Sequence, residues 1–163
     1  SKYWNNELYS INKIRILIFG HNKGNNQIKE FIDTMDDNIE LIHLGHIDII
    51  DSKLHIAKEK YDDDKILFII EKINPHLIWF PSKKPESYCY AMSYAISSGY
   101  PIVCYKTGAF IERLHNRPMT WLIELKDDLN NNLKIIKSSF DTLSLYSNIR
   151  IPVVDIDRYI KYF

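Results

Sequence analysis

The sequence predicts a doubly wound α/β domain, that is, a parallel sheet with helices on both faces. Short runs of branched apolar residues alternate along the chain with segments whose apolar residues recur every three or four positions. These are the patterns of buried strands and of amphipathic helices. Parallel neighbours need a crossover connection of about a dozen residues, and the helical segments supply it. The chain has 163 residues, so we expect 1–163 to form a single domain.

The first part of the chain predicts three strands, with a helix between the first two. The strand at 14–20 (IRILIFG) is apolar and ends at a glycine. The helix at 25–35 has one apolar face that can pack on the sheet. That face carries Ile28, Phe31, Ile32 and Met35. The second strand is IELIHL at 39–44, and the third, a weaker one, is at 54–57.

The middle of the chain predicts a helix, a strand and a second helix. Three aspartates at 62–64 precede the first helix, whose N-terminal turn favours negative charge. Its apolar residues are Ile66, Ile69, Ile70 and Ile73. The strand at 77–80 (LIWF) is stopped by Pro81. Ser87 is expected to cap the next helix, and Gly99 to end it. One face of that helix carries Tyr88, Ala91, Met92 and Ala95.

The last part of the chain predicts two strands and two helices. PIVCY at 101–105 is a strand, a short helix begins after Gly108, and TWLI at 120–123 is the final strand. Two aspartates at 127–128 introduce the last helix. Its inward residues are Leu129, Leu133, Ile136 and Phe140. This alternation requires a parallel sheet that is covered on both faces.

Composition excludes several classes of partner. Lys plus Arg and Asp plus Glu number 21 each, so the formal net charge is zero and we expect no nucleic acid to bind. No apolar run reaches the roughly 20 residues that span a bilayer, which leaves only peripheral contact with a membrane. Cys89 and Cys104 lie in apolar segments, which predicts buried free thiols and a cytoplasmic protein. The chain begins with Ser1 and has no signal peptide, so we interpret it as a fragment of a longer protein.

Ligands of doubly wound sheets bind beyond the carboxyl ends of the strands. Three loops lie there, at 20–26, 81–87 and 106–109. The first loop contains Gly20, Lys23 and Gly24, which can offer backbone N–H groups and a cation to a phosphate. It lacks the third glycine of a dinucleotide site and the Gly-Lys-Ser/Thr ending of a P-loop. The alternative is a strand-to-helix turn that needs glycine for its backbone conformation.

The second and third loops offer a carboxylate and small residues. Glu86 stands at the start of the predicted helix, where it can accept hydrogen bonds from sugar hydroxyls while the amides of Ser87 and Tyr88 meet a phosphate. The alternative is a carboxylate that only complements the helix dipole. Gly108 in the third loop allows a ligand to approach the backbone closely. Arg113, in the short helix that follows, is expected on a solvated face.

Other chemistries have less support. His43 and His46 are three apart on a strand and its end, so a shared metal is not expected. The aspartates at 62–64 and the pair Asp155 and Asp157 resemble the acidic metal motif of metal-dependent nucleotide-sugar transferases, but we interpret them as helix caps or surface residues. No Gly-x-Ser-x-Gly elbow occurs, and no activating residue adjoins either cysteine. A signalling receiver domain needs an acidic pair at the end of its first strand. Residues 20–22 are Gly-His-Asn instead, so this class is not supported.

Four segments, in a fixed order, carry a family resemblance. They are KIRILIFGHNKG at 13–24, YDDDKILFIIEKINPHLIWFPS at 61–82, PESYCYAMSYAISSGYPIV at 85–103 and TGAFIERLHNRPMTWLI at 107–123. Within them Pro-Glu-Ser-Tyr is followed by Gly-x-Pro-x-Val and then by Gly-Ala-x-x-Glu-Arg. In this succession the chain resembles the C-terminal domain of group 1 glycosyltransferases of the GT-B fold, especially those of bacterial surface-polysaccharide biosynthesis.

The resemblance implies a Rossmann-like domain that binds the nucleotide-sugar donor. It implies that a glycan acceptor is held by a separate N-terminal domain outside this chain, that a hexosyl group is transferred between the two domains, and that no metal or cofactor is needed. Glu86 and Lys23 are then the catalytic candidates, Glu86 on the sugar hydroxyls and Lys23 on the diphosphate. The substrate-binding candidates are Gly20, Gly24, Ser87, Tyr88, Cys89, Tyr94 and Gly108. Alone, the domain is expected to be inactive.

The chain departs from the family pattern at two positions. Tyr94 stands where the family has a second glutamate, eight residues after the first, and His21 stands where many members have an arginine. These departures keep open a second hypothesis, a non-catalytic sugar-nucleotide-binding or protein-interaction module with a degenerate glycosyltransferase site.

Overall fold

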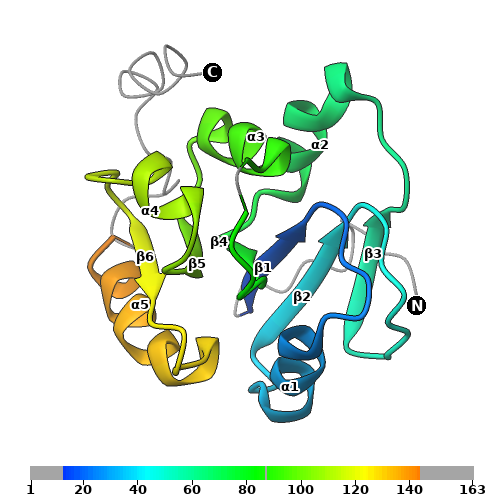
Figure 1. The fold of residues 1–163 in the computed structure, drawn as a ribbon. Coiled ribbons are helices and arrows are strands. Elements are labelled where there is room, and N and C mark those ends of the chain that lie inside the picture. The colour runs from blue at the N-terminus through cyan, green and yellow to red at the C-terminus, as the bar shows by residue number, and fades with distance from the viewer. Residues whose placement is uncertain (1–12, 87, 144–163) are drawn as a thin grey trace.

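The computed structural model describes residues 13–86 and 88–143, and they form a six-stranded parallel sheet covered by helices (Figure 1). The strand order is β3-β2-β1-β4-β5-β6, and every pairing is parallel. The strands are β1 (Ile14–Phe19), β2 (Ile39–Leu44), β3 (Leu54–Lys58), β4 (Leu77–Phe80), β5 (Ile102–Tyr105) and β6 (Thr120–Ile123). The helices are α1 (Asn26–Thr34), α2 (Ile66–Ile73), α3 (Tyr90–Ser98), α4 (Ala109–Arg113) and α5 (Leu129–Leu143), with a 3-10 turn at Asp63–Lys65.

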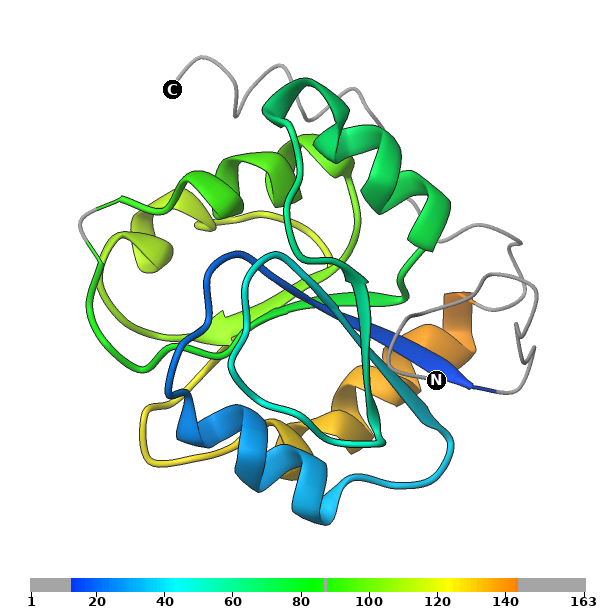
Figure 2. The same ribbon diagram turned by 90° about the vertical axis from the view of Figure 1, so that its right-hand side faces the viewer.

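The sheet separates two hydrophobic cores, because successive side chains of a strand point to opposite faces. Helices α1 and α5 cover one face, and α2, α3 and α4 cover the other, as Figure 2 shows from the side. In β1, for example, Ile16 and Ile18 join the core under α1 and α5, whereas Leu17 and Phe19 join the other. The doubly wound architecture expected from the sequence is therefore confirmed.

Local signals place most of the helix ends where the sequence predicts them. The Asn25 side chain accepts a hydrogen bond from the Ile28 amide and caps α1. Asp128 does the same for α5 through the Asn131 amide. Gly99 ends α3 in the left-handed conformation, with φ 76°. The side chain of Phe140, predicted to point inward from α5, lies outside the described part.

The start of α3 differs from the prediction. Ser87 was expected to cap this helix, but the helix begins at Tyr90, and Cys89 occupies the N-cap position in an extended conformation (φ −131°, ψ 108°). Tyr88 therefore precedes the helix and is exposed, instead of sharing its buried face with Met92 and Ala95. The reason is only partly local: Pro85 stiffens this segment, and the hydrogen bond from the distant Ala109 amide to the Glu86 carbonyl holds it as a loop. Ser87 lies outside the described residues.

Candidate functional site

A cleft of about 350 Å³ opens at the carboxyl ends of β1 and β4. β1 is paired with β2 on one side and with β4 on the other, so the strand order reverses here. The chain leaves β1 for α1 on one face of the sheet and leaves β4 for α3 on the other, which opens the space between the two loops. The described residues that line the cleft are Phe19, Gly20, His21, Asn22, Tyr61, Phe80, Pro81, Ser82, Glu86, Tyr88, Cys89, Tyr90, Ala91 and Phe110.

The first wall of the cleft is the loop after β1. Gly20 has φ 109°, and a Cβ placed on it would lie 3.3 Å from the Cβ of Ala91, so this glycine lets the loop approach α3. The Gly20 amide donates to the Leu44 carbonyl. The Asn22 side chain contacts Nε2 of His43 at 3.0 Å. The backbone amide of Asn22 donates to the His46 carbonyl. The loop is therefore anchored on the end of β2.

Lys23 and Gly24 do not line the cleft, although they follow these residues directly. The Gly24 amide donates to both carboxylate oxygens of Asp48, at 3.0 and 3.1 Å. This hydrogen bond is the main cause that lowers the pKa of Asp48, and the charges of Lys23 and Lys29 add to it. The amide that the sequence assigns to a phosphate is therefore paired with a carboxylate of the protein itself.

The second wall carries the one carboxylate among the described lining residues, Glu86. Glu86 is half-buried, and the neighbouring Cys89 thiol is hydrogen-bonded to its side chain. Burial is the main cause that raises the pKa of Cys89 to about 11; the Met92 amide opposes it, and the charge and hydrogen bond of Glu86 add smaller increases. Glu86 thus lies beside the N-cap of α3. The amides of Tyr90 and Ala91, rather than those of Ser87 and Tyr88, belong to the first turn of that helix.

Gly108 has a different task from the predicted one. A Cβ on Gly108 would lie 2.7 Å from both the backbone nitrogen and oxygen of Glu86 and 3.2 Å from the Cα of Pro85. The space above this glycine is therefore filled by the second loop, and no ligand approaches it there. Its φ of 55° with ψ −145° also favours glycine. Gly108 positions Glu86 through backbone packing.

Arg113 also differs from the prediction of a solvated face. Its guanidinium donates to the Cys89 carbonyl at 2.7 Å and to the Ser93 hydroxyl at 2.6 Å, and it lies 4.5 Å from the centre of the Tyr88 ring. These contacts tie α4 to the start of α3 and orient Tyr88 at the cleft. No sequence signal showed this pairing, because the two helices meet only in the folded chain.

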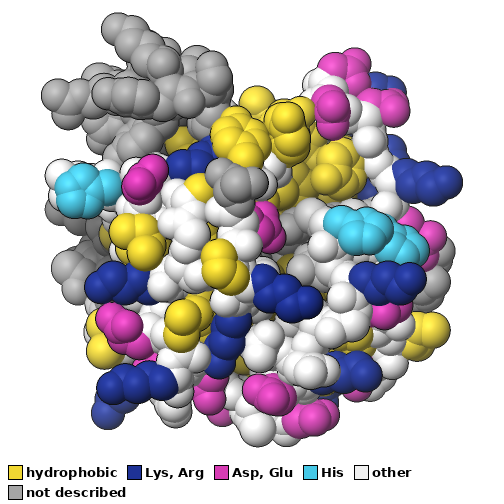
Figure 3. All heavy atoms as spheres, in the orientation of Figure 1, with side chains coloured by type: hydrophobic (Ala, Val, Ile, Leu, Met, Phe, Trp, Pro, Cys, Tyr) yellow, Lys and Arg dark blue, Asp and Glu magenta, His cyan; other side chains and the backbone are white. Residues whose placement is uncertain are grey.

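Aromatic side chains form the floor and one rim of the cleft. Phe19 lies 5.7 Å from Tyr61 and 6.4 Å from Phe80 between ring centres. Tyr88 and Tyr90 are in edge-to-face contact at 4.9 Å on the rim, where hydrophobic side chains gather over α3 (Figure 3). Tyr61 and Phe19 were not predicted as site residues. The position of Phe19 beside Gly20, at the carboxyl end of the predicted strand, was the available signal.

Tyr94 lies outside the described lining of the cleft. Its ring contacts Phe19 edge-on at 6.3 Å between centres. Desolvation, and then the charge of Asp63 and a hydrogen bond to it, raise the pKa of Tyr94. The residue at the position where the resemblance expects a second glutamate therefore faces the 3-10 turn before α2.

Histidines surround the base of the first loop without forming a metal site. Residues 13–86 and 88–143 contain no group of three or more His, Cys, Asp or Glu side chains that could hold a metal ion. His43 is fully buried, and its ring nitrogens contact the Asn22 side chain and the Gly45 carbonyl. His21 and His46 stack on each other instead, with ring centres 5.0 Å apart.

The burial of His43 predicts acid sensitivity. Desolvation lowers the pKa of His43 from 6.5 to about 4. Below pH 6.5 the His43 imidazole takes up a proton in the unfolded chain but not in the folded one. The contribution of His43 to folding stability is therefore present above this pH and is lost as the pH falls toward 4. We expect a loss of about 3 kcal/mol over this window from His43. Urea unfolding of wild-type protein and His43→Gln at several pH values measures it. Equal pH slopes for the two proteins would contradict the assignment, and the exposed His115→Gln serves as control.

Two further observations concern membrane-spanning helices and the cysteine thiols. No helix in the described ranges has the length and apolar character needed to cross a membrane. Of the two thiols, Cys104 is buried and Cys89 only half-buried, and both are free. The prediction of two buried thiols is therefore correct only for Cys104.

Comparison with known proteins identifies the fold. No family model and no curated protein matches the sequence. Among solved structures, the chain is similar to HepE of Anabaena in complex with UDP and glucose, at 16% identity and a TM-score of 0.60, and to the same protein with UDP, at 14% and 0.61. A third structure, with UDP-glucose, gives 14% and 0.58. Each alignment covers 93% of this chain and 48% of the other, so this chain spans about half the length of HepE.

Proposed function

We propose that this chain is the donor-binding domain of a glycosyltransferase of the GT-B type. It binds a nucleoside-diphosphate sugar, and the enzyme transfers a hexosyl group from it to a glycan acceptor in polysaccharide biosynthesis without a metal ion. The observation that carries the proposal is the position of Glu86 in the cleft at the strand-order reversal, beside the N-terminus of α3. The similarity in fold to a protein crystallised with UDP-glucose supports it.

The groups around Glu86 suit a diphosphosugar. A carboxylate accepts hydrogen bonds from two adjacent sugar hydroxyls, which a neutral side chain does less well. Tyr90 and Ala91 begin α3 and line the same cleft, so their amides are suited to meet the phosphate next to the sugar. As the glycosidic bond breaks, the leaving diphosphate gains charge, and fixed dipoles stabilise this charge more than they stabilise the ground state.

We do not expect these 163 residues to bind the acceptor. We expect it to be bound by a second domain, because this chain matches about half the length of HepE. The isolated chain is therefore expected to bind a donor without transferring its sugar. The cleft volume of about 350 Å³ is at the lower end of the range for ligand pockets.

The test is the binding of UDP and UDP-glucose by calorimetry. In Glu86→Gln we expect UDP-glucose to bind 10- to 100-fold more weakly, because a charge-assisted hydrogen bond is worth about 1.5–3 kcal/mol. UDP should bind to Glu86→Gln within about threefold of its wild-type affinity, because UDP lacks the donor sugar whose hydroxyls Glu86 is proposed to bind. The exposed Glu112→Gln is the matched control and should bind both ligands as wild type does.

The second candidate function is a non-catalytic module with a degenerate site. It is favoured by the orientation of Tyr94 toward Asp63 and away from the cleft lining, and by the pairing of Gly24 with Asp48, which leaves the first loop with fewer free groups for a ligand. Absence of saturable binding to UDP-, GDP- and dTDP-sugars would support this candidate. Equal losses of UDP and UDP-glucose affinity in Glu86→Gln would instead show that the carboxylate does not serve the sugar.

A further inference from the structure

A second cavity, of about 90 Å³, lies between α1 and the start of α5, on the face of the sheet that these two helices cover. One side of α1 contributes Gln27, Glu30, Phe31 and Thr34, which the helical spacing places in a single stripe. The other described lining residues are Trp79 of β4, Tyr105 of β5, and Asp128, Leu129 and Asn130 at the start of α5. None of these lines the cleft that contains Glu86. The cavity has room for a few water molecules or a small organic molecule.

Contacts between the two helices hold the walls of this cavity in place. The Asn130 side-chain amide donates a hydrogen bond to the Thr34 hydroxyl, which in turn donates to the Glu30 carbonyl. Farther along α5, Lys137 forms an ion pair with Asp36, just beyond the end of α1, at 3.4 Å. The cavity is therefore a preformed part of the fold, which lowers the entropy cost of binding a ligand there.

The floor of the cavity carries a buried hydrogen-bond donor that has no acceptor. Trp79 is fully buried, and its ring lies edge-on to Phe31 with 5.1 Å between the ring centres. Among the described residues, none accepts a hydrogen bond from the indole Nε1 of Trp79. Buried donors are nearly always paired with a protein group or with water, so an unpaired one calls for an explanation. Since Trp79 lines the cavity, a molecule bound there can supply the missing acceptor.

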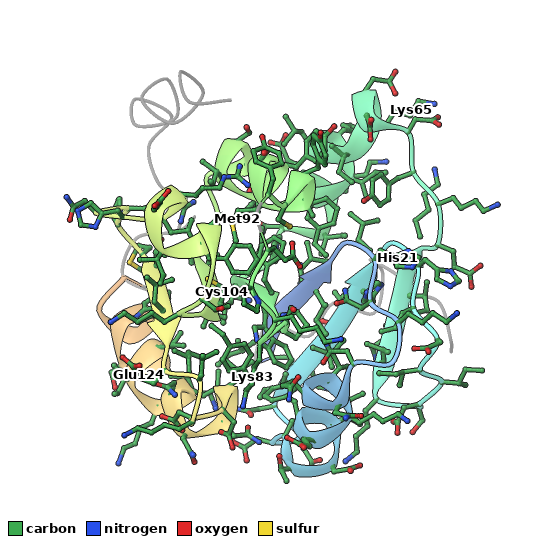
Figure 4. The ribbon with its side chains drawn as sticks, viewed as in Figure 1. His21, Lys65, Lys83, Met92, Cys104 and Glu124 are labelled. Atoms are coloured by element: carbon green, nitrogen blue, oxygen red, sulfur yellow. The ribbon has the colours of Figure 1, made fainter. Side chains whose placement is uncertain are left out.

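The rim of the cavity carries acceptors of negative charge. Glu30 and Asp128 are exposed there, and after burial their charges are the main causes that raise the pKa of Tyr105 to about 12. The described lining contains no Lys or Arg. Lys83 approaches from outside that lining, 5.0 Å from the centre of the Tyr105 ring, and Figure 4 shows it between α1 and α5. Two carboxylates against one lysine leave an excess of negative charge, which disfavours an anionic ligand.

A hydroxyl group suits both ends of this cavity. It accepts a hydrogen bond from the indole N–H and donates one to a carboxylate, whereas an ammonium group has no acceptor and an ionised carboxylate has no donor. The apolar side chains of Phe31, Trp79 and Leu129 suit the C–H surface of a polyol. We propose that this cavity binds a small neutral polyol or the hydroxymethyl end of a sugar. The inference does not depend on the proposed function, since the cavity and the donor cleft share no described lining residue.

The experiment follows the indole N–H signal of Trp79 by heteronuclear NMR while glycerol is added. Trp79→Phe identifies this signal, because it removes one of the three tryptophans of the chain. For wild-type protein we expect a saturable shift with a Kd of about 1–100 mM, as for a ligand of few atoms. In Glu30→Gln glycerol should bind about three- to tenfold more weakly, because a hydrogen bond to a charged acceptor is lost. Asp33→Asn removes an exposed carboxylate of α1 outside the described lining and should bind as wild type does.

Further probes define the ligand class. In Trp79→Phe, glycerol binding is followed through the backbone amide of Phe31 and should be about fivefold weaker, because a neutral hydrogen bond is lost. Glycerol phosphate should bind at least about fivefold more weakly than glycerol, because Glu30 and Asp128 repel it. Glucose distinguishes the two sources of hydroxyl groups. Binding at least as tight as that of glycerol assigns the cavity to a sugar, and binding of glycerol alone assigns it to a free polyol.

Three results would overturn the proposal. The absence of a saturable shift with both glycerol and glucose would leave the cavity to water alone. Equal glycerol affinities in wild type and Glu30→Gln would show that the carboxylate does not hold the ligand. Tighter binding of acetamide than of glycerol would assign the cavity to an amide instead of a hydroxyl group. Circular dichroism shows whether each variant is folded. Should Trp79→Phe be unfolded, the indole signal is assigned through its nuclear Overhauser contacts with Phe31, and the surface variant Glu30→Gln still tests the site.

Discussion

Gly45→Ala is expected to lower the free energy of unfolding by about 4 kcal/mol. Gly45 follows β2 with φ 115°, a conformation that L side chains rarely adopt. A Cβ at this position would overlap the carbonyl oxygen of Gly20 and lie 3.0 Å from its carbon. Both are backbone atoms, which cannot move aside as a side chain does. The new methyl group must therefore push apart the loops after β1 and β2, and the wall of the cleft with them.

Urea unfolding followed by circular dichroism measures this loss. Gly24→Ala is the matched control, because Gly24 also has a positive φ of 62° but nothing lies within 4 Å of its added Cβ. Only the backbone strain remains there, about 1 kcal/mol. Because Gly20 lines the cleft, the folded fraction of Gly45→Ala should also bind UDP-glucose more weakly. A Gly45→Ala protein as stable as Gly24→Ala would show that the loop after β1 is not held against β2 as described.

Arg15→Met is expected to cost about 3 kcal/mol of folding free energy. Arg15 is 1% exposed at the start of β1. Its guanidinium donates to the carbonyls of Ile73 and Asn74 at the end of α2, and its Nε lies 3.5 Å from a carboxylate oxygen of Glu40. Methionine has a similar shape but no donor, so it leaves two carbonyls and a largely buried carboxylate without this partner.

The double variant Arg15→Met/Glu40→Gln identifies the origin of this cost. Removing the charge of Glu40 as well should restore part of the stability, because an uncompensated buried charge costs more than a neutral amide. Lys13→Met, at an exposed position two residues earlier, is the control and should change stability by less than about 0.5 kcal/mol. If the double variant were less stable than Arg15→Met, the ion pair would not be the main loss.

Most strands and helices of the fold can be predicted from patterns within a few neighbouring residues. The predicted bounds of β2, β4 and β6 are those observed, and β1 differs only by leaving out Gly20. Apolar periodicity placed these elements because a buried strand and an amphipathic helix each expose their pattern within a few residues. The start of α3 was wrong because Ser87 is a good capping residue, and a local rule cannot show that the Ala109 amide holds the Glu86 carbonyl outside the helix.

The candidate site was predictable in its location but not in its contacts. The three loops that the sequence singled out do meet at the carboxyl ends of the strands, because all six strands are parallel. The cleft, however, takes Gly20 and His21 from the first loop and leaves out Lys23 and Gly24. Nothing in the spacing of residues 20–24 distinguishes these pairs. The difference arises because Asp48, which follows β2, accepts the Gly24 amide.

By itself, then, the sequence determined the doubly wound sheet, the order of its elements along the chain and the edge at which a ligand would bind. Only the tertiary structure decided that Gly108 packs under Glu86, that Tyr94 faces Asp63, and that His21 stacks on His46 at the cleft. The physical reason is range. Propensity, capping and amphipathic period act within a few residues, whereas these contacts join segments that the folded sheet brings together from distant parts of the chain.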